Sequence, residues 1–440
     1  MAEKVPISVL IDELKGIGLY DAYTQQKLDV LASSSFEGSA QISQKERMRI
    51  RDLLSDVTQR IEQDGRISFI GLAGGEKQDK GEAIACNVER FLGFGNTGPV
   101  YEVTASGQTY ALKIYSARQL KEVMKDHGKF GLGGIIQDIE EMDKSTMLGQ
   151  LGKKVLARKG KQVYGRCNRI VRIHNVGLQN DCMFVLMDML AVDPMNKANA
   201  VQLGGDIVDM ACWGVDCAVG LCTLHVEERR LHLNIRPEAF IRKVADKNKR
   251  LPKYTFFNYP ATYPRPEGRP FIENEFITVD HLDNSIETVD KGPKGIGTIG
   301  SWVFTPPENI LQLVKTLRQD YEQHVINRAP FEDPQPIRIA RTQMDDIWAL
   351  GVTLFQFYSG GKYPFGEPKN LAEMVKTILL TPFDFSAIPG PFQDLLSSML
   401  DKDPKKRFAR VLDGCPEKVA SRKVMAEAVL YKLEEIALRV

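Results

Sequence analysis

The sequence predicts an α+β protein in which a β-rich unit precedes a larger helical unit, with a small helical module in front of both. Two observations support this: short strand-like runs with glycine turns begin near residue 88, and an apolar run typical of a buried helix follows at 208–226. A chain of 440 residues is long enough for two or three hydrophobic cores. We expect a helical module at 1–66, a linker at 67–87, a β-rich unit at 88–190 and a helical unit at 191–440.

The composition is that of a globular protein without a dominant charge. Apolar residues make up 43% of the chain and the formal net charge is +1, so neither nucleic acid nor a membrane surface is an expected partner. The apolar run at 208–226 contains Asp209 and Asp216, which favours a buried helix over a membrane span. The N-terminus lacks a signal-peptide pattern, and the seven cysteines show no C-x-x-C spacing, so we expect no metal site. The expected location is the cytoplasm, or a host cell into which the protein is delivered.

The first 66 residues carry the apolar spacing of helices. Ser43 and Glu46 have capping-box spacing, and Ile50, Leu53 and Val57 follow on one helical face. Such a module dimerises, binds a protein partner or packs on the next unit.

A glycine hairpin stands at the start of the β-rich unit. Residues 92–103 contain G-x-G-x-x-G-x-V, and glycine at these points lets backbone N–H groups approach phosphate oxygens closely. A dinucleotide-binding turn shares this spacing, but it requires a helix directly afterwards. Here a turn at Ser106 and Gly107 is followed by another strand, which carries Ala111 and Lys113.

Five further segments follow in order. They are an apolar strand and its continuation at 184–190, L-H-L-N-I-R-P-E-A at 231–239, G-S-W-V-F-T-P-P-E at 300–308, D-I-W-A-L-G at 346–351 and D-P-K-K-R at 403–407. With the glycine hairpin and the lysine strand, they resemble the motifs of the eukaryotic-type Ser/Thr protein kinase superfamily over residues 88–412. The resemblance implies a two-lobed protein-kinase-like fold with a β-rich N-lobe and a helical C-lobe.

The resemblance also implies an ATP site. The glycine hairpin and Lys113 would face the phosphates, Met187 would be the gatekeeper, and the backbone after it would face adenine. The residues implied in ATP binding are Gly93, Gly95, Gly98, Val100, Ala111, Lys113, Met187, Asp188, Met189 and Ile241. Three residues have implied structural roles: Asp346 would brace the catalytic loop, and Glu308 would pair with Arg407.

The positions that carry kinase chemistry are replaced. In the kinase pattern H-R-D-L-x-x-x-N, the Asp accepts the substrate proton and the Asn holds Mg²⁺; this chain retains His232 but has Asn234 and Ala239 at those places. Asn258 stands where the Mg²⁺-binding Asp of D-F-G would be. Mg²⁺ prefers carboxylate oxygens, and an amide cannot act as the base, so the resemblance implies a pseudokinase. ATP would then bind with Mg²⁺ held weakly or not at all.

The remaining segments leave alternatives open. The residue facing Lys113 from the following helix would be Lys144, or Glu140 or Glu141 after a rotation of that helix. A long activation segment at 259–308 and an insertion at 309–344 are predicted, with 265–297 and 309–344 as candidate partner surfaces beside the N-terminal helices.

Three functions are compatible with these motifs. The first is a pseudokinase acting as a scaffold or allosteric regulator in signalling. The second is an ATP-dependent transferase with an unorthodox site, in which Lys113, Arg236, Asn234 and Asn258 would position the nucleotide. The third is an interaction module without a ligand, its site closed by Phe94 and Pro99.

Overall fold

The computed structural model defines the fold over parts of the chain separated by gaps. The residues that it describes are 64–71, 83–95, 98–116, 171, 173–179, 182–189, 207–227, 230–233, 235–242, 277–279, 286–287, 294–297, 302–312, 339–366 and 371–439. The predicted helical module at 1–66 lies outside them up to residue 63, and Arg66 already belongs to the first strand.

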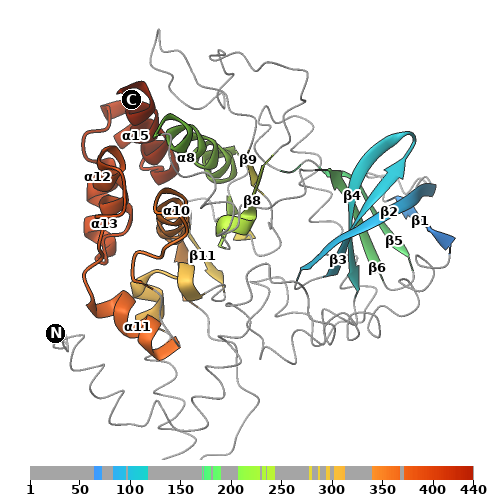
Figure 1. The fold of residues 1–440 in the computed structure, drawn as a ribbon, viewed down its shortest axis with the longest axis horizontal. Coiled ribbons are helices and arrows are strands. Elements are labelled where there is room, and N and C mark those ends of the chain that lie inside the picture. The colour runs from blue at the N-terminus through green and yellow to red at the C-terminus, as the bar shows by residue number, and fades with distance from the viewer. Residues whose placement is uncertain are drawn as a thin grey trace, which may run out of the picture.

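Six strands form a closed antiparallel barrel (Figure 1). In order around the barrel they are β1 (Arg66–Gly71), β2 (Ala83–Gly95), β3 (Gly98–Ala105), β4 (Gln108–Ser116), β6 (Cys182–Asp188) and β5 (Ile173–Gln179). β1 closes the barrel because it pairs with β2 along one edge and with β5 along the other.

Alternating side chains fill the barrel. Successive residues of a strand point to opposite faces, so every second residue reaches the interior. Val103 of β3, Leu112 of β4 and Phe184 of β6 are buried there. Phe69 of β1 stacks on Phe184 with ring centroids 5.0 Å apart, so β1 also contributes a buried side chain to the barrel core.

The fold predicted from the sequence is wrong in its architecture. The kinase resemblance implied a two-lobed fold with a β-rich N-lobe, whereas the strands here form a closed six-stranded barrel. The cause is β1, which together with the start of β2 occupies the segment predicted as a linker at 67–87. Ile67 and Phe69 alternate with Arg66 and Ser68, and this period of two makes the segment a strand with one buried side.

The helices whose bounds are defined follow the barrel strands along the chain and lie apart from the barrel (Figure 1). They are α8 (Ile207–Cys222), α10 (Gln343–Tyr358), α11 (Leu371–Leu380), α12 (Gly390–Met399), α13 (Pro404–Leu412), α14 (Glu417–Ala420) and α15 (Met425–Arg439). Every residue of α10 is buried, which makes it the central helix. α8 packs against α15, and Gly214 permits the close approach, because a Cβ there would overlap Leu433 and the Tyr358 hydroxyl.

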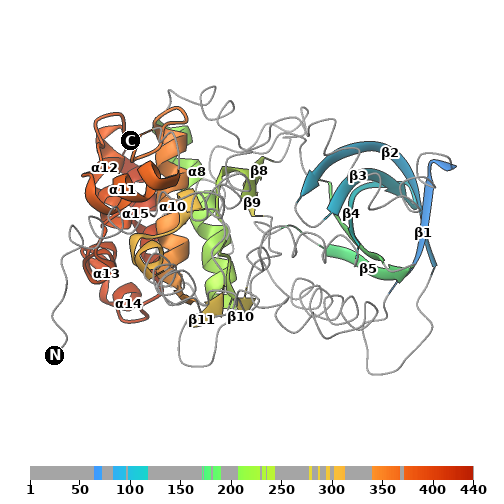
Figure 2. The same cartoon turned by 90° about the horizontal axis from the view of Figure 1, so that it is seen from below.

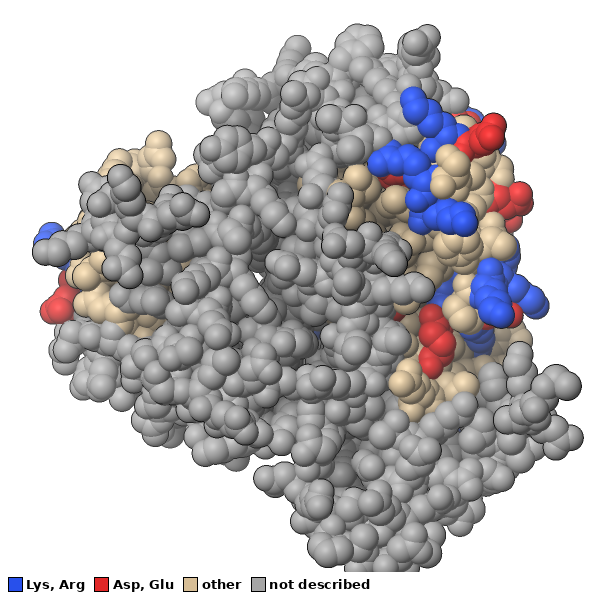
Figure 3. All heavy atoms as spheres, turned by 180° about the vertical axis from the view of Figure 1, so that it is seen from behind, with Lys and Arg blue, Asp and Glu red and all other residues tan. Residues whose placement is uncertain are grey.

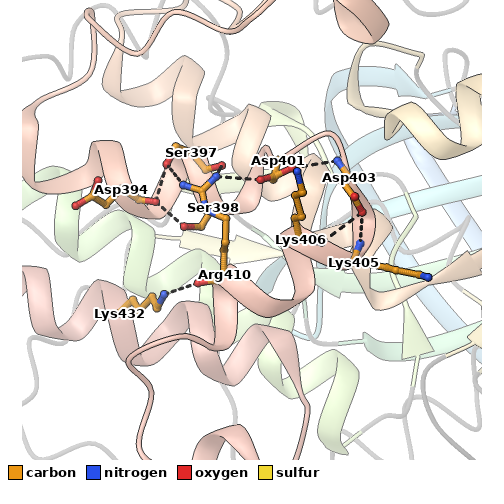
Figure 4. A network of polar contacts seen from close by, with 9 residues as sticks. All are labelled: Asp394, Ser397, Ser398, Asp401, Asp403, Lys405, Lys406, Arg410 and Lys432. Carbon is orange, nitrogen blue, oxygen red and sulfur yellow. Dashed lines mark hydrogen bonds and ion pairs between the residues drawn. The ribbon is translucent and has the colours of Figure 1, made fainter. Parts of the chain in front are cut away.

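Polar side chains fix the helix ends. The Met344 N–H donates to Thr342 Oγ1 and the Thr342 N–H to Asp345 Oδ2, a capping box at the start of α10. Figure 4 shows the corresponding network at α12 and α13, where Asp403 accepts from the backbone at the start of α13 and Arg410 pairs with Asp401. On the face in Figure 3, cationic and anionic side chains are interspersed over the helical part.

Three pairs of short strands accompany the helices. β7 (Arg230–Leu231) pairs with β10 (Ile286–Glu287), β8 (Phe240–Arg242) with β9 (Ile277–Val279), and β11 (Lys294–Gly297) with β12 (Ile339–Thr342). In both Figure 1 and Figure 2, β8 and β9 lie on the side of the helices that faces the barrel. The segment predicted as a partner surface at 265–297 thus contributes three strands that pair within the molecule. Among the helices described, none has the length and apolar character needed to span a membrane.

Candidate functional site

The outer face of the barrel at β3, β4 and β6 brings together several of the residues predicted to bind ATP. Lys113 lies between Val100 on β3 and Val185 on β6 in the strand register. One step along, Ala111 lies opposite Met187. These side chains share the face opposite to the barrel core, because Leu112 and Leu186 point inward. We call the row of Val100, Ala111, Lys113, Val185 and Met187 the outer-face row.

Lys113 is the charged member of the outer-face row, and only 8% of it is exposed. Its Nζ lies 4.9 Å from the centre of the Tyr115 ring, on the same side of β4, so the aromatic face compensates part of the cost of burying the charge. A buried ammonium group beside the apolar side chains of this row is suited to bind an anion, since its interactions are weakly screened there.

The glycine hairpin joins β2 to β3 beside this row. Gly95 pairs with Gly98, and Gly93 lies opposite Val100, so the hairpin leads directly to the outer-face row. A bulge between Phe91 and Gly93 bends the strand just before the hairpin. The turn residues 96 and 97 lie outside the described residues.

The end of β6 carries the residues predicted to face adenine. Asp188 is the last residue of the strand and is half-buried, as is Met189 after it. His174 Nε2 donates to Asp188 Oδ1 at 2.5 Å. No sequence motif pointed to this pair, because the pairing of β5 with β6 is what brings the two residues together.

A second group of predicted residues surrounds Asp346, in the first turn of α10. Its carboxylate is fully buried and accepts the backbone N–H groups of His232 and Leu233, each at 2.7 Å. His225 Nε2 donates to the same carboxylate at 2.8 Å. His225, to which no sequence motif pointed, lies on the π-helical turn η1 (Thr223–Glu227) directly after α8.

Three donors on one carboxylate determine its ionisation. Burial by itself raises the pKa of Asp346, but the hydrogen bond and charge of His225, the charge of His232 and the Leu233 N–H together outweigh burial. The pKa of Asp346 is therefore held below its ordinary value, and the residue is a carboxylate at neutral pH.

The loop that Asp346 holds has an unusual backbone. Leu233 has a φ of 61°, in the left-handed region that residues other than glycine and asparagine rarely adopt. The loop continues into the short helix η2 (Pro237–Ala239), where Ala239 is fully buried. The position that holds Mg²⁺ in the kinase pattern thus presents a methyl group in a packed environment.

Glu308 and Arg407 form an ion pair between the segment after η4 (Trp302–Phe304) and α13. Arg407 is fully buried, and its guanidinium lies 5.1 Å from the centre of the Trp348 ring. Burial raises the pKa of Glu308, and the charge of Arg407 opposes that rise. The pair links α13 to the residues that follow η4.

Other predicted residues lie outside the described parts. Asn234, Asn258, Glu140, Glu141 and Lys144 are among them, and of Ile241 only the backbone in β8 is defined. Within the described ranges, no group of three or more His, Cys, Asp or Glu residues is placed to hold a metal ion.

Fold and site together define a protein with a β-barrel, a buried lysine on its outer face and a loop held by a buried carboxylate. A 76-residue part of the chain is 41% identical to ribosomal protein S6 kinase alpha-4 of Homo sapiens, and the same values hold for that of Mus musculus. The match covers 16% of this chain and 10% of each relative, so the chain spans about a tenth of their length. A search of protein-family models gave no match. What this similarity shows is a kinase-like relationship over a short segment.

Proposed function

We propose that this protein is a kinase-related pseudokinase that binds an adenine nucleotide on the outer-face row and acts as a scaffold or regulator. The observation that carries the proposal is the placement of Lys113, 8% exposed on a face shared with Val100, Ala111 and Met187. The apolar side chains of Ala111 and Met187 suit the faces of a purine. The ammonium group of Lys113, two residues along β4, suits a phosphate.

The absence of phosphate transfer follows from the chemistry of the loop at 231–239. Ala239 has no side-chain oxygen to offer a metal, and an amide at Asn234 cannot take a proton from a hydroxyl group. The carboxylate of Asp346 nevertheless accepts the backbone N–H of Leu233 and so stabilises the left-handed conformation of that residue. A loop that is held without its acid and metal groups fits a binding or regulatory role.

The first experiment measures nucleotide binding by thermal shift with ATP, ADP and AMP, each with and without Mg²⁺. A ligand of the folded state stabilises it by about 2.7 kcal/mol at a hundred times its dissociation constant. We expect ATP and ADP to raise the melting temperature equally with and without Mg²⁺. Lys113→Met, which removes the charge but retains the length of an apolar chain, is expected to abolish most of this shift.

The second experiment follows phosphate from labelled ATP. We expect no transfer to the protein itself or to generic protein substrates. Metal-dependent transfer of the γ-phosphate that disappears in Lys113→Ala would contradict the proposal, and a nucleotidyl or phosphoryl adduct in the mass spectrum would favour the unorthodox transferase. An unchanged melting temperature with every nucleotide would instead favour an interaction module.

A further inference from the structure

A cluster of polar and aromatic side chains lies at the end of β6, next to the segment predicted to face adenine. Tyr110 of β4 lies opposite Asp188 of β6 in the strand register, on the inward-pointing face. His174 of β5 donates to Asp188 at 2.5 Å and meets the Tyr110 ring edge-on, with ring centroids 4.9 Å apart. We call Tyr110, His174 and Asp188 the β6 clamp.

His174 reaches this position through an irregularity of β5. Ile173 pairs with Met187 and Asn175 with Leu186, so His174 is the extra residue of a β-bulge. A bulge re-aims one side chain and bends its strand. Here it turns the imidazole toward the end of β6, where the regular ladder stops and the backbone leaves the sheet.

The clamp and the outer-face row lie on opposite sides of the same short piece of backbone. Met187 belongs to the row and faces Ala111, while Asp188, the next residue, is held from behind by His174. The His174 and Asp188 side chains are 25% and 34% exposed, so their interaction is only partly screened by water. A backbone segment fixed in this way presents its N–H and C=O groups in one orientation.

We propose that His174 is a positioning residue that orients the main chain of Asp188 and Met189 for binding an adenine base. The inference rests on the proposed nucleotide site. In it the β6 clamp acts on binding of the base, whereas Lys113 acts on binding of the phosphates. Without the clamp, the backbone at the end of β6 is less restricted. Binding of the base must then order this backbone, and that costs part of the binding free energy.

The experiment compares dissociation constants for adenosine, ADP and ATP in the wild type and in His174→Ala, by calorimetry well below the melting temperature. We expect His174→Ala to weaken all three ligands by a similar factor of about ten, which corresponds to one charge-assisted hydrogen bond. Lys113→Met is expected to weaken ATP and ADP far more than adenosine. His174→Gln retains a donor that reaches Asp188 and is expected to restore most of the affinity, which simple loss of packing would not allow.

Two further variants control for stability. Asp188→Asn retains a neutral acceptor for His174 and replaces His174→Ala as the test if that variant does not fold. We expect it to weaken the affinity for all three ligands by a smaller factor. Arg439→Ala breaks an exposed ion pair with Glu435 on α15 and is expected to change no affinity.

The outcomes separate the two proposals. Wild-type protein that binds none of the ligands overturns the nucleotide site and the clamp's role together. Wild-type protein that binds all three, with His174→Ala binding equally well, overturns the clamp alone. Equal losses in His174→Ala and His174→Gln would likewise show that the hydrogen bond to Asp188 is not what matters.

Discussion

Asp346 accepts three hydrogen bonds from the loop and the turn that surround it, and none of its atoms is exposed. Asp346→Ala would leave two backbone N–H groups and the Nε2 of His225 without this acceptor. Removing one partner of a buried charged contact typically costs about 3–5 kcal/mol. We expect a loss of that size in the free energy of unfolding, measured by urea denaturation, together with faster hydrogen exchange at residues 232 and 233.

Asp384→Ala is the matched control for this substitution. Asp384 is exposed and accepts hydrogen bonds only from Ser386, in a local turn. We expect a change of less than about 1 kcal/mol there, as for most surface substitutions. Equal losses in the two variants would show that the contacts of Asp346 contribute little to stability.

At the residue scale, the sequence motifs indicated that Asp346 contacts the loop after residue 231 but not that His225 contacts Asp346 as well. The resemblance pointed to Asp346 and the loop after residue 231, because short motifs record which residue types recur at a spacing. His225 belongs to no such motif, and its approach depends on a π-helical turn that adds a residue to the end of α8. His174 was missed for a similar reason, since its direction depends on a bulge.

At the scale of elements, the closure of the barrel depends on the contact between β1 and β5. Only two residue pairs join these strands, Ile70 with Leu178 and Gly71 with Gly177. A Cβ at Gly177 would overlap the Phe69 ring and the Ile70 carbonyl oxygen. We expect Gly177→Ala to separate β1 from β5, with a cost of about 1–3 kcal/mol from overpacking. Hydrogen exchange of the amides at 66–71 would then accelerate more than exchange in α10.

Gly390→Ala tests whether that cost is specific. Gly390 begins α12, and a Cβ there would meet no atom within 4 Å. Its substitution is expected to be neutral or slightly stabilising, because alanine restricts the unfolded chain. Unchanged exchange at 66–71 in Gly177→Ala would show that β1 accommodates the methyl group without leaving the barrel.

The hairpin and the lysine strand could be predicted from local pattern, whereas the closing strand could not. Gly93, Gly98 and Lys113 lie where the alternation and turn signals put them, in β2, β3 and β4. β1 is a six-residue strand next to a glycine-rich segment, and its second partner lies more than a hundred residues away. Local periodicity identifies a strand but not the strand with which it pairs, so a closed barrel cannot be distinguished from an open sheet.

At the scale of the whole molecule, two buried acids of α15 couple stability to pH. Burial raises the pKa of Glu434 to about 8, and the charge of Glu435 adds to the rise. Burial raises the pKa of Glu427 to about 7 even though the Arg422 charge opposes it. Both values exceed the ordinary value of 4.5, so between pH 4.5 and 8 the folded state holds protons that the unfolded state has released. Stability is then fully present below about pH 4.5 with respect to these groups and falls as the pH rises.

Glu434→Gln should remove the larger part of this dependence. The amide is always neutral, so the variant is expected to gain stability over the wild type at pH 8 and to differ little at pH 5. Each unit of pKa difference corresponds to about 1.4 kcal/mol, which makes the change in slope measurable by urea denaturation at pH 5, 6, 7 and 8. Glu417→Gln removes an exposed carboxylate from α14 and should leave the slope as it is. If Glu434→Gln and the wild type lose stability in parallel across this range, the Glu434 carboxyl group is not what couples stability to pH.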